Sequence, residues 1–313
     1  MEQQSGMLKR ILANTGDMEL LNKLEAMQPS DVQSLLLEIF GKLAGKASPA
    51  GLLREYERNR YVKPSALDAV AYLRLELDLA SMAGEMGITP VLMSPAGLLG
   101  SCSAIASVSQ NKVLSAIKGT EILADPTNML ALDIAHRLRR REWSNTEAPI
   151  HLCAASRVVR SQPFSGPALF SHFGIFCLVS SGRDTGSYGC EHSLLQTHLA
   201  FYSRFFQECI GLRMAVVLKK RGGYADGEGF LLRTLGHLQK TLPHVAVETD
   251  RTEADNSYYL GTNFKLLLPV DGQPSEIGDG GFVDWTQKLL GNKKERLLVS
   301  GIGLDRLLAL SSK

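Results

Sequence analysis

Residues 300–310, near the end of the 313-residue chain, predict a short strand that runs directly into an apolar helix. Gly301 and Gly303 lack a Cβ, so the backbone there can lie against a ligand or a packed neighbour. The helix carries an apolar face made of Leu304, Leu307, Leu308 and Leu310. Arg306 falls in the first turn of this helix, which we expect to be largely buried, and a buried guanidinium needs an anionic partner. A carboxylate of the protein would satisfy that need, and so would a phosphate of a ligand, which a guanidinium fits bidentately.

The composition is that of an ordinary globular protein, with 44% hydrophobic and 21% charged residues and a net charge of +2. This small charge gives no argument for a nucleic-acid-coating or membrane-surface protein, and we expect no tRNA partner. Five cysteines without CxxC pairs predict reduced thiols, not a disulfide framework or a zinc site. The N-terminus lacks an apolar signal segment and no apolar run reaches about 18 residues, so we expect a soluble cytoplasmic protein without membrane spans.

Residues 1–50 predict a small helical appendage, and residues 51–313 a larger core. The segment 45–51, Gly-Lys-Ala-Ser-Pro-Ala-Gly, is the best candidate for a linker. Within the core, residues 65–86 predict a long helix with two buried faces, ending at Gly87. The strand expected at 88–95 contains proline, which is typical of a sheet edge or a bulge.

Three further segments carry candidate site residues. Residues 150–182 predict an antiparallel hairpin, and Arg160 at the end of its first strand is either a ligand-binding or an ordinary ion-paired arginine. Asp125 and Thr127 lie at a strand-to-helix corner, where either can cap the helix that follows. Residues 278–281, Gly-Asp-Gly-Gly, predict a glycine-rich turn after the pair Tyr258-Tyr259.

These segments resemble the motifs of the class II aminoacyl-tRNA synthetases. Residues 301–307, Gly-Ile-Gly-Leu-Asp-Arg-Leu, resemble motif 3, the hairpin resembles motif 2, and the helix and strand at 65–95 resemble motif 1. Tyr258-Tyr-Leu-Gly-Thr-Asn-Phe, followed by the glycine-rich segment, is similar to the histidyl enzymes and to the related regulatory subunit of ATP phosphoribosyltransferase. The resemblance covers roughly residues 60–313. It implies an α+β fold, with an antiparallel sheet of about six or more strands flanked by helices, and a homodimer through residues 65–95.

The resemblance also implies roles for individual residues. Arg160 would bind the α-phosphate of ATP and Arg306 the γ-phosphate, which makes them the catalytic pair. The other nucleotide-binding positions would be Gln162, Phe173 and Gly303. The substrate-binding positions would be Asp125, Thr127, His172, Tyr258, Tyr259, Gly261, Gly280 and Gly281. Mg²⁺ would accompany ATP, with Glu191, Glu276 and Asp279 as candidate ligands that the sequence does not choose between.

The chain also departs from the histidyl pattern at three positions. Gln162 replaces an acid that helps to position adenine, and Phe176 replaces an acid that holds the α-amino group of the substrate. Ala254 replaces a catalytic arginine, for which Arg251 could substitute only through a different loop. Histidine bound in the usual way is therefore not expected, because a phenyl ring cannot hold an ammonium as a carboxylate does.

Three functions remain open from the sequence. The first is an enzyme that activates a small carboxylate as its adenylate and passes it to an acceptor other than tRNA, favoured by the pair Arg160 and Arg306. The second is a regulatory or binding paralogue without catalysis, favoured by the three departures. The third, a true aminoacyl-tRNA ligase, is disfavoured by the near-neutral charge and because we expect no anticodon-binding domain in this sequence.

Overall fold

In a computed structural model of the protein, residues 6–162, 171–250 and 258–311 are described, and the chain divides into two units. One unit consists of residues 1–59 with 116–120, and the other of residues 60–115 with 121–313. The first unit contains α1 (Gly6–Thr15), α2 (Leu20–Glu25), α3 (Pro29–Ala44) and α4 (Pro49–Arg58). The Ser48 side chain caps α4 by accepting a hydrogen bond from the Gly51 amide at 3.1 Å. The described part of the N-terminal segment thus consists mainly of helices.

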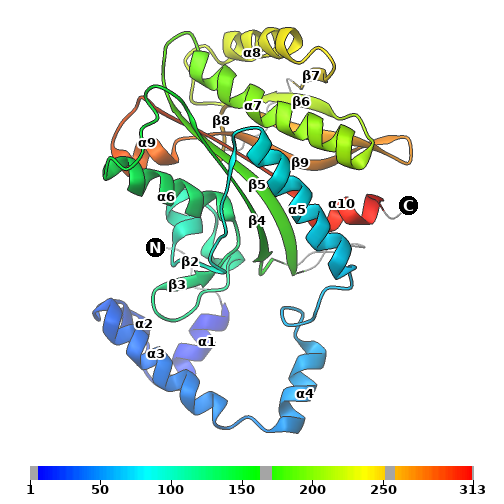
Figure 1. Ribbon diagram of the computed structural model, residues 1–313. Coiled ribbons are helices and arrows are strands. Elements are labelled where there is room, and N and C mark those ends of the chain that lie inside the picture. The colour runs from blue at the N-terminus through cyan, green and yellow to red at the C-terminus, as the bar shows by residue number, and fades with distance from the viewer. Residues whose placement is uncertain (1–5, 163–170, 251–257, 312–313) are drawn as a thin grey trace. The chain divides into compact units, whose positions relative to one another are not determined.

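The second unit is built on a mixed sheet of eight strands in the order β1-β4-β5-β10-β9-β8-β6-β7 (Figure 1). The strands are β1 (Thr89–Pro90), β4 (Ile150–Val159), β5 (His172–Arg183), β6 (Ala215–Lys220), β7 (Ala246–Asp250), β8 (Leu260–Val270), β9 (Gln273–Val283) and β10 (Glu295–Gly303). The pairs β1–β4 and β6–β7 are parallel, and all other neighbours are antiparallel. A separate pair, β2 (Ala96–Leu98) and β3 (Thr120–Ile122), forms a small second sheet. The predicted α+β fold is confirmed.

Helices cover both faces of the large sheet. On one face, α5 (Ala69–Glu85), α7 (Gly189–Phe205), α8 (Gly227–Thr241) and α10 (Leu304–Ser311) share one apolar cluster with the strands (Figure 1). On the other face, α6 (Pro126–Arg139) and α9 (Trp285–Leu290) pack in a second cluster. Single-turn helices lie at Ser101–Ile105, Gln110–Lys112 and Phe206–Ile210. No helix in the described part of the chain is long and apolar enough to cross a membrane.

Side chains along β5 alternate between the two faces of the sheet, so neighbouring residues belong to different apolar clusters. Phe176 and Leu178 belong to the cluster beneath α5 and α7, whereas Cys177 and Val179 belong to the cluster beneath α6. Phe176 stacks on Phe201 of α7 with ring centroids 5.4 Å apart. Because side chains alternate between the two faces of a strand, the neighbouring residues Phe176 and Cys177 lie on opposite faces of the sheet.

Two local predictions are wrong. The glycines at 278–281 do not form a turn but lie inside β9, and the turn between β8 and β9 is made by Asp271 and Gly272 at positive φ. The long helix was expected to bury two faces, but only the face of Tyr72, Leu75, Leu79 and Met82 is buried. Val70, Leu73 and Leu77 on its other face are 58%, 62% and 64% exposed. The proline expected at a sheet edge is Pro90, in the edge strand β1.

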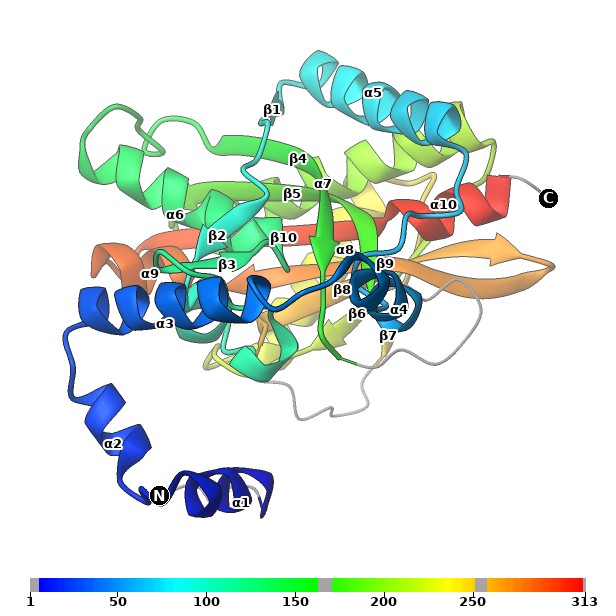
Figure 2. The same ribbon diagram turned by 90° about the horizontal axis from the view of Figure 1, so that it is seen from below.

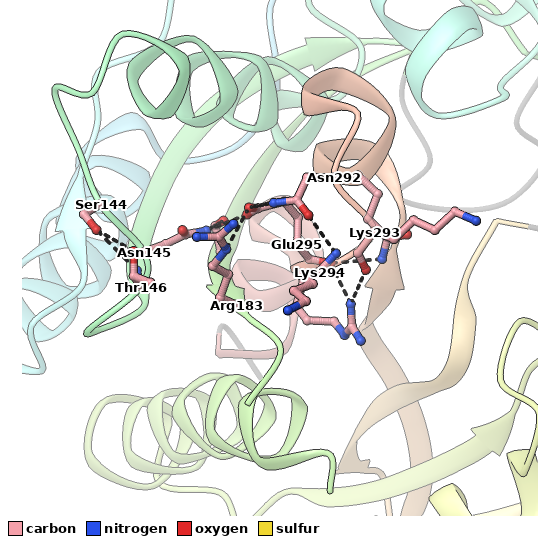
Figure 3. A network of polar contacts seen from close by, with 11 residues as sticks. Ser144, Asn145, Thr146, Arg183, Asn292, Lys293, Lys294 and Glu295 are labelled. Carbon is pink, nitrogen blue, oxygen red and sulfur yellow. Dashed lines mark hydrogen bonds and ion pairs between the residues drawn. The ribbon is translucent and has the colours of Figure 1, made fainter. Parts of the chain in front are cut away.

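A polar network fixes the beginning of β10 (Figure 3). Asn145 Nδ2 donates to Glu295 Oε2 at 2.7 Å, and Asn292 Nδ2 donates to Glu295 Oε1 at 2.9 Å. Arg183 Nε lies 3.6 Å from Oε1 of the same carboxylate, at the end of β5. The buried Glu295 therefore anchors the start of β10 to its neighbours, and the opposite end of that strand borders the candidate site.

Candidate functional site

Two adjoining cavities lie where the start of β5 and the end of β10 meet the middle of β9, beside the start of α6. The first, cavity A, has a volume of about 210 Å³ and is bordered by Phe173 and Gly303 among others. The second, cavity B, has a volume of about 350 Å³ and is bordered by Gln162 and Asn128. Their linings share Asp125, Arg160, Tyr258, Tyr259 and Asp279, which therefore mark the junction between the two cavities.

The floor of cavity A is a row of three residues on adjacent strands. Gly301 of β10 pairs with Cys177 of β5 on one side and with Asp279 of β9 on the other. Strands β5, β10 and β9 lie side by side, as Figure 2 also shows. Because Gly301 has no side chain, the middle of this row leaves the space between Cys177 and Asp279 open.

Arg160 is positioned by the end of the β4–β5 hairpin. Its amide donates to Ser171 O at 2.9 Å, and its Nε donates to Ala124 O at 3.1 Å. Its Cζ lies 5.3 Å from the centroid of the Phe173 ring. Arg160 and Phe173, both expected at a nucleotide, therefore stand together at cavity A, while Gln162 borders cavity B. A cation beside an aromatic face suits a phosphorylated aromatic ligand.

Asp125 and Thr127 meet at the predicted strand-to-helix corner. Asp125 is the N-cap of α6, and its Oδ1 accepts from the Thr127 amide at 2.9 Å and from Thr127 Oγ1 at 2.7 Å. Pro126 occupies the first helical turn, where its missing N–H costs nothing. Capping thus explains the local sequence, and it also holds both side chains at the border of cavity A.

The two tyrosines form an aromatic wall at the junction. Tyr258 meets Tyr259 edge to face, with ring centroids 4.7 Å apart, and also contacts Trp285. Burial raises the pKa of each tyrosine well above its ordinary value, so both hydroxyls stay protonated near neutral pH. The hydroxyl of Tyr259 donates to Asp279 Oδ2 at 3.3 Å.

Asp279 is the residue that sequence reasoning undervalued, since it appeared there only as a metal candidate. Its carboxyl borders both cavities. Burial raises its pKa, and the nearby charge of Glu276 raises it further. The only signal in the sequence was an acidic residue inside a glycine-rich segment, which the structure places in the middle of β9.

Arg306 lies in the first turn of α10, as predicted, but it is not buried. Its side chain is exposed, and it makes no hydrogen bond or ion pair with the described residues, so the prediction of a buried guanidinium is wrong. Its neighbour Asp305 is buried and accepts a hydrogen bond from the Gly174 amide at 2.6 Å. Arg306 lines neither cavity, although its Cβ lies 3.8 Å from where a Cβ on Gly303 would stand, at the border of cavity A.

Two residues expected in the pocket face the other side of the sheet. His172 bonds through Nδ1 to Arg157 at 2.8 Å and through Nε2 to the carbonyl of Lys63, and it borders neither cavity. Phe176 is buried against Phe201, so it does not occupy the position of the missing acid. The cavity-facing residue next to it is Cys177, whose thiol has a pKa raised by burial and stays uncharged.

The glycines named as substrate contacts have packing roles. Gly261 has φ +65°, and a Cβ there would lie 2.5 Å from the Tyr224 ring. A Cβ on Gly280 would lie 2.4 Å from the Cβ of Ser300, and one on Gly281 would lie 2.6 Å from the Tyr259 ring. None of the three borders the cavities, although Gly281 makes the room in which Tyr259 sits.

The metal candidates are dispersed. Glu276 pairs with Lys265, and the buried Glu191 accepts from Arg296 at 2.7 Å and from Tyr224 at 2.9 Å, away from both cavities. Within the described residues, no group of three or more His, Cys, Asp or Glu side chains could hold a metal ion. Ala254 and Arg251, where the histidyl pattern places a catalytic arginine, lie outside the described residues.

Comparison of whole structures shows the same fold in known proteins at low sequence identity. Histidyl-tRNA synthetase of S. aureus superimposes with a TM-score of 0.59 at 13% identity, over 80% of this chain and 68% of that one. An ATP phosphoribosyltransferase regulatory subunit/histidyl-tRNA synthetase of Bacillus halodurans gives 0.62 at 12% identity, over 82% and 83%. A histidine–tRNA ligase subunit of Alicyclobacillus acidocaldarius gives 0.56 at 14%, over 81% and 96%. No protein-family model and no curated protein matches the sequence.

Proposed function

Because the core has the fold of the class II aminoacyl-tRNA synthetases, we propose that the protein binds ATP and activates a small carboxylic acid as its adenylate. The observation that carries the proposal is the junction of the two cavities, where Arg160 stands between a site with an aromatic face and a second, larger cavity. Cavity A would receive the nucleotide and cavity B the acid. The acceptor of the activated acid would be a nucleophile other than tRNA, since the net charge of +2 offers little for a polyanion.

The chemistry of the junction suits this reaction. A carboxylate oxygen of the acid would form a bond to the α-phosphorus of ATP while the bond from that phosphorus to the pyrophosphate oxygen breaks. Negative charge grows on the α-phosphate oxygens in this step, and Arg160, held by Ala124 O, would stabilise that charge without reorganising. Phe173 would pack against the adenine. Mg²⁺ would enter with the ATP phosphates and neutralise their charge, with water supplying most of its other ligands.

A second candidate is a binding or regulatory protein that uses the same cavities without catalysis. Two observations favour it. Arg306, the expected γ-phosphate ligand, lies outside the linings of both cavities, and the cavity-facing residue beside Phe176 on β5 is an uncharged thiol, Cys177. The Bacillus halodurans protein of the same fold is described as an ATP phosphoribosyltransferase regulatory subunit/histidyl-tRNA synthetase.

We further propose that the protein forms a homodimer through residues 65–95. The exposed apolar face of α5 is formed by Val70, Leu73 and Leu77, and α5 itself contacts the edge strand β1. Contiguous apolar surface of this kind is typical of a contact between subunits.

ATP–pyrophosphate exchange tests the enzymatic proposal. Purified protein with Mg²⁺ and pools of amino acids and other small carboxylic acids should support exchange with one class of acid. Arg160→Ala should reduce that exchange by at least about 100-fold, as the loss of a transition-state charge partner does. Arg139→Ala is the matched control, because Arg139 is exposed and distant from both cavities. ATP binding without exchange for any acid would favour the regulatory protein.

A further inference from the structure

The residues that directly follow β4 lie at the border of the candidate site. The strand ends one residue before Arg160, which lines both cavities, and Gln162 lines cavity B. The Arg160 amide still donates across the hairpin to Ser171 O at 2.9 Å. Ser161 and Gln162 lie beyond the paired part of the strand, so the direction of the backbone there depends on the groups that bond them.

Arg60 bonds this segment through both ends of its guanidinium group. Its Nη1 donates to Gln162 O at 3.3 Å, and its Nη2 donates to Ser161 O. The same Nη2 donates to the hydroxyl of Tyr61 at 2.7 Å, and that hydroxyl in turn donates to Ser161 O at 3.1 Å. One planar guanidinium thus bridges two successive carbonyl groups, which the single point charge of a lysine does not reproduce.

The other side of the same segment is bonded to the border of cavity B. The Ser161 amide donates to Lys112 O at 3.0 Å, and the Ser161 hydroxyl donates to Asn111 O. Lys112 is itself part of the lining of cavity B. Ser161 is therefore held between residues 111–112 on one side and the side chains of Arg60 and Tyr61 on the other.

Arg60 contributes little to the apolar core. It is exposed, lines neither cavity and is the first residue of the second unit, two positions after the end of α4. Exposed polar contacts of this kind add little to the stability of a fold. The contacts of Arg60 converge instead on the two carbonyl groups that follow Arg160, and its removal would leave the contact of Arg160 Nε with Ala124 O in place.

We propose that Arg60 is a positioning residue of the candidate site, which holds the carbonyl groups of Ser161 and Gln162 and thereby keeps Arg160 directed at the phosphate of the nucleotide. The inference rests on the proposed function for the nucleotide itself. Arg60 acts through Arg160 and touches no ligand. Its effect on binding is expected to be large for an exposed residue, because small errors in the position of a charged group weaken its contact strongly.

Calorimetric titration of the full chain with ATP and Mg²⁺ tests the proposal without requiring catalysis. We expect Arg60→Ala to bind ATP at least about 5-fold more weakly than the wild type, and Arg60→Lys to recover part of the loss. Arg58→Ala is the matched control, since Arg58 ends α4, is exposed and makes no hydrogen bond or ion pair with the described residues. Wild-type affinity in Arg60→Ala would overturn the proposal.

A double-mutant cycle shows whether Arg60 acts through Arg160. If it does, Arg60→Ala has little left to disturb once the Arg160 side chain is gone. We expect the double mutant to bind ATP no more than about 2-fold more weakly than Arg160→Ala alone. Losses that multiply, as they do for independent residues, would contradict the proposed mechanism.

The phosphate dependence of the effect separates positioning from general damage to the site. Arg60→Ala should weaken the binding of AMP and leave that of adenosine within about 2-fold of the wild type, because adenosine has no phosphate for Arg160 to contact. Its thermal unfolding should stay close to that of the wild type and of Arg58→Ala. Equal losses for AMP and adenosine, or a loss that parallels a lower melting temperature, would show a merely structural role.

The two proposals fail in different ways. If ATP binds and Arg160→Ala weakens it while Arg60→Ala does not, the nucleotide site stands and the role of Arg60 is wrong. If ATP binding depends on both arginines but no acid supports pyrophosphate exchange, the role of Arg60 stands and adenylation fails. If the wild type binds no ATP, both proposals are wrong.

Discussion

At the scale of single residues, the candidate site contains a carboxyl group, that of Asp279, whose ionised form is disfavoured by burial. Asp279 lies in the middle of β9 with a carboxyl whose pKa is raised first by burial and then by Glu276. Asp125 raises it too, whereas Tyr259 and Lys265 act in the opposite direction. An ionised Asp279 therefore weakens the unliganded protein, which is common for groups whose purpose is to meet a ligand.

Asp279→Asn should consequently make the unliganded protein more stable near neutral pH. The folded pKa of Asp279 lies above its ordinary value of 3.8, so the cost of ionising it is fully present above the folded pKa. The gain from the substitution should shrink as the pH falls through the folded pKa and vanish below 3.8. Urea unfolding of both proteins across this range measures the difference. A mutant that is less stable than the wild type at every pH would contradict the account.

Sequence motifs at this scale predicted which residues lie near one another, whereas the roles of those residues in binding stay predictions. Arg160 and Phe173 were predicted together and stand together, because a hairpin sets the positions of its strand ends. Arg306 was predicted to be buried because leucines surround it in the sequence. On a short helix, however, one side chain can face solvent while its neighbours are buried, and Arg306 is exposed in this way. No sequence motif singled out Asp279. Its position at the junction of the cavities follows from the register of β5, β10 and β9.

At the scale of elements, β10 is the strand on which the site is arranged. Its start is held by the buried Glu295, and its end carries the glycines that open the floor of cavity A (Figure 3). The predicted strand and helix at 300–310 are confirmed as the end of β10 and as α10. The face on which Phe176 lies could not be predicted, because the hydrophobic run in β5 is buried on both sides and shows no alternation.

Two glycines near this floor should respond differently to alanine. A Cβ on Gly301 would meet Ile175 and the Phe176 carbonyl at 3.5 Å, an ordinary contact, so Gly301→Ala should fold with nearly wild-type stability. Its methyl would stand between Cys177 and Asp279, and ligand affinity should fall by about 10-fold or more. Thermal unfolding and ATP titration of one preparation separate the two effects.

Gly278→Ala is the contrasting change on the neighbouring strand. Its Cβ would lie 2.2 Å from the Gly301 carbonyl oxygen, so the backbone of β9 or β10 would have to move. We expect a loss of about 1–3 kcal/mol in the free energy of unfolding. A Gly278→Ala variant as stable as the wild type, together with a Gly301→Ala variant that unfolds, would contradict both expectations.

At the scale of the whole molecule, the order of the motifs was enough to predict the fold. A helix and edge strand, a hairpin, a glycine-rich segment and a final strand and helix occur in the expected order, although the glycine-rich segment is a strand and not the turn that was predicted. The surface through which the protein contacts a partner was harder to predict from the sequence. The second apolar face of α5 was predicted to be buried within the chain, but it is exposed. The prediction failed because hydrophobic periodicity shows that a helix face is apolar and does not show what covers that face.

The proposed dimer makes that face testable. Leu73→Glu and Leu77→Glu place charges on the exposed apolar side of α5 and should convert a dimer into a monomer. Light scattering coupled to size exclusion measures the mass directly. Leu232→Glu changes an exposed leucine of α8 that is 45% exposed and should leave the mass unchanged. A wild-type protein that stays monomeric at high concentration would contradict the proposed interface.

The central claim is that the junction around Arg160 is a nucleotide site. Equilibrium titration of ATP with Mg²⁺ into the wild type, Arg160→Ala and Arg139→Ala tests it most directly. We expect the wild type and Arg139→Ala to bind with similar affinity, and Arg160→Ala to bind at least about 10-fold more weakly, since a charge-assisted contact to phosphate is lost. The absence of ATP binding in the wild type, or binding that Arg160→Ala leaves unchanged, would mean that Arg160 has a structural role and that this site is not a nucleotide site.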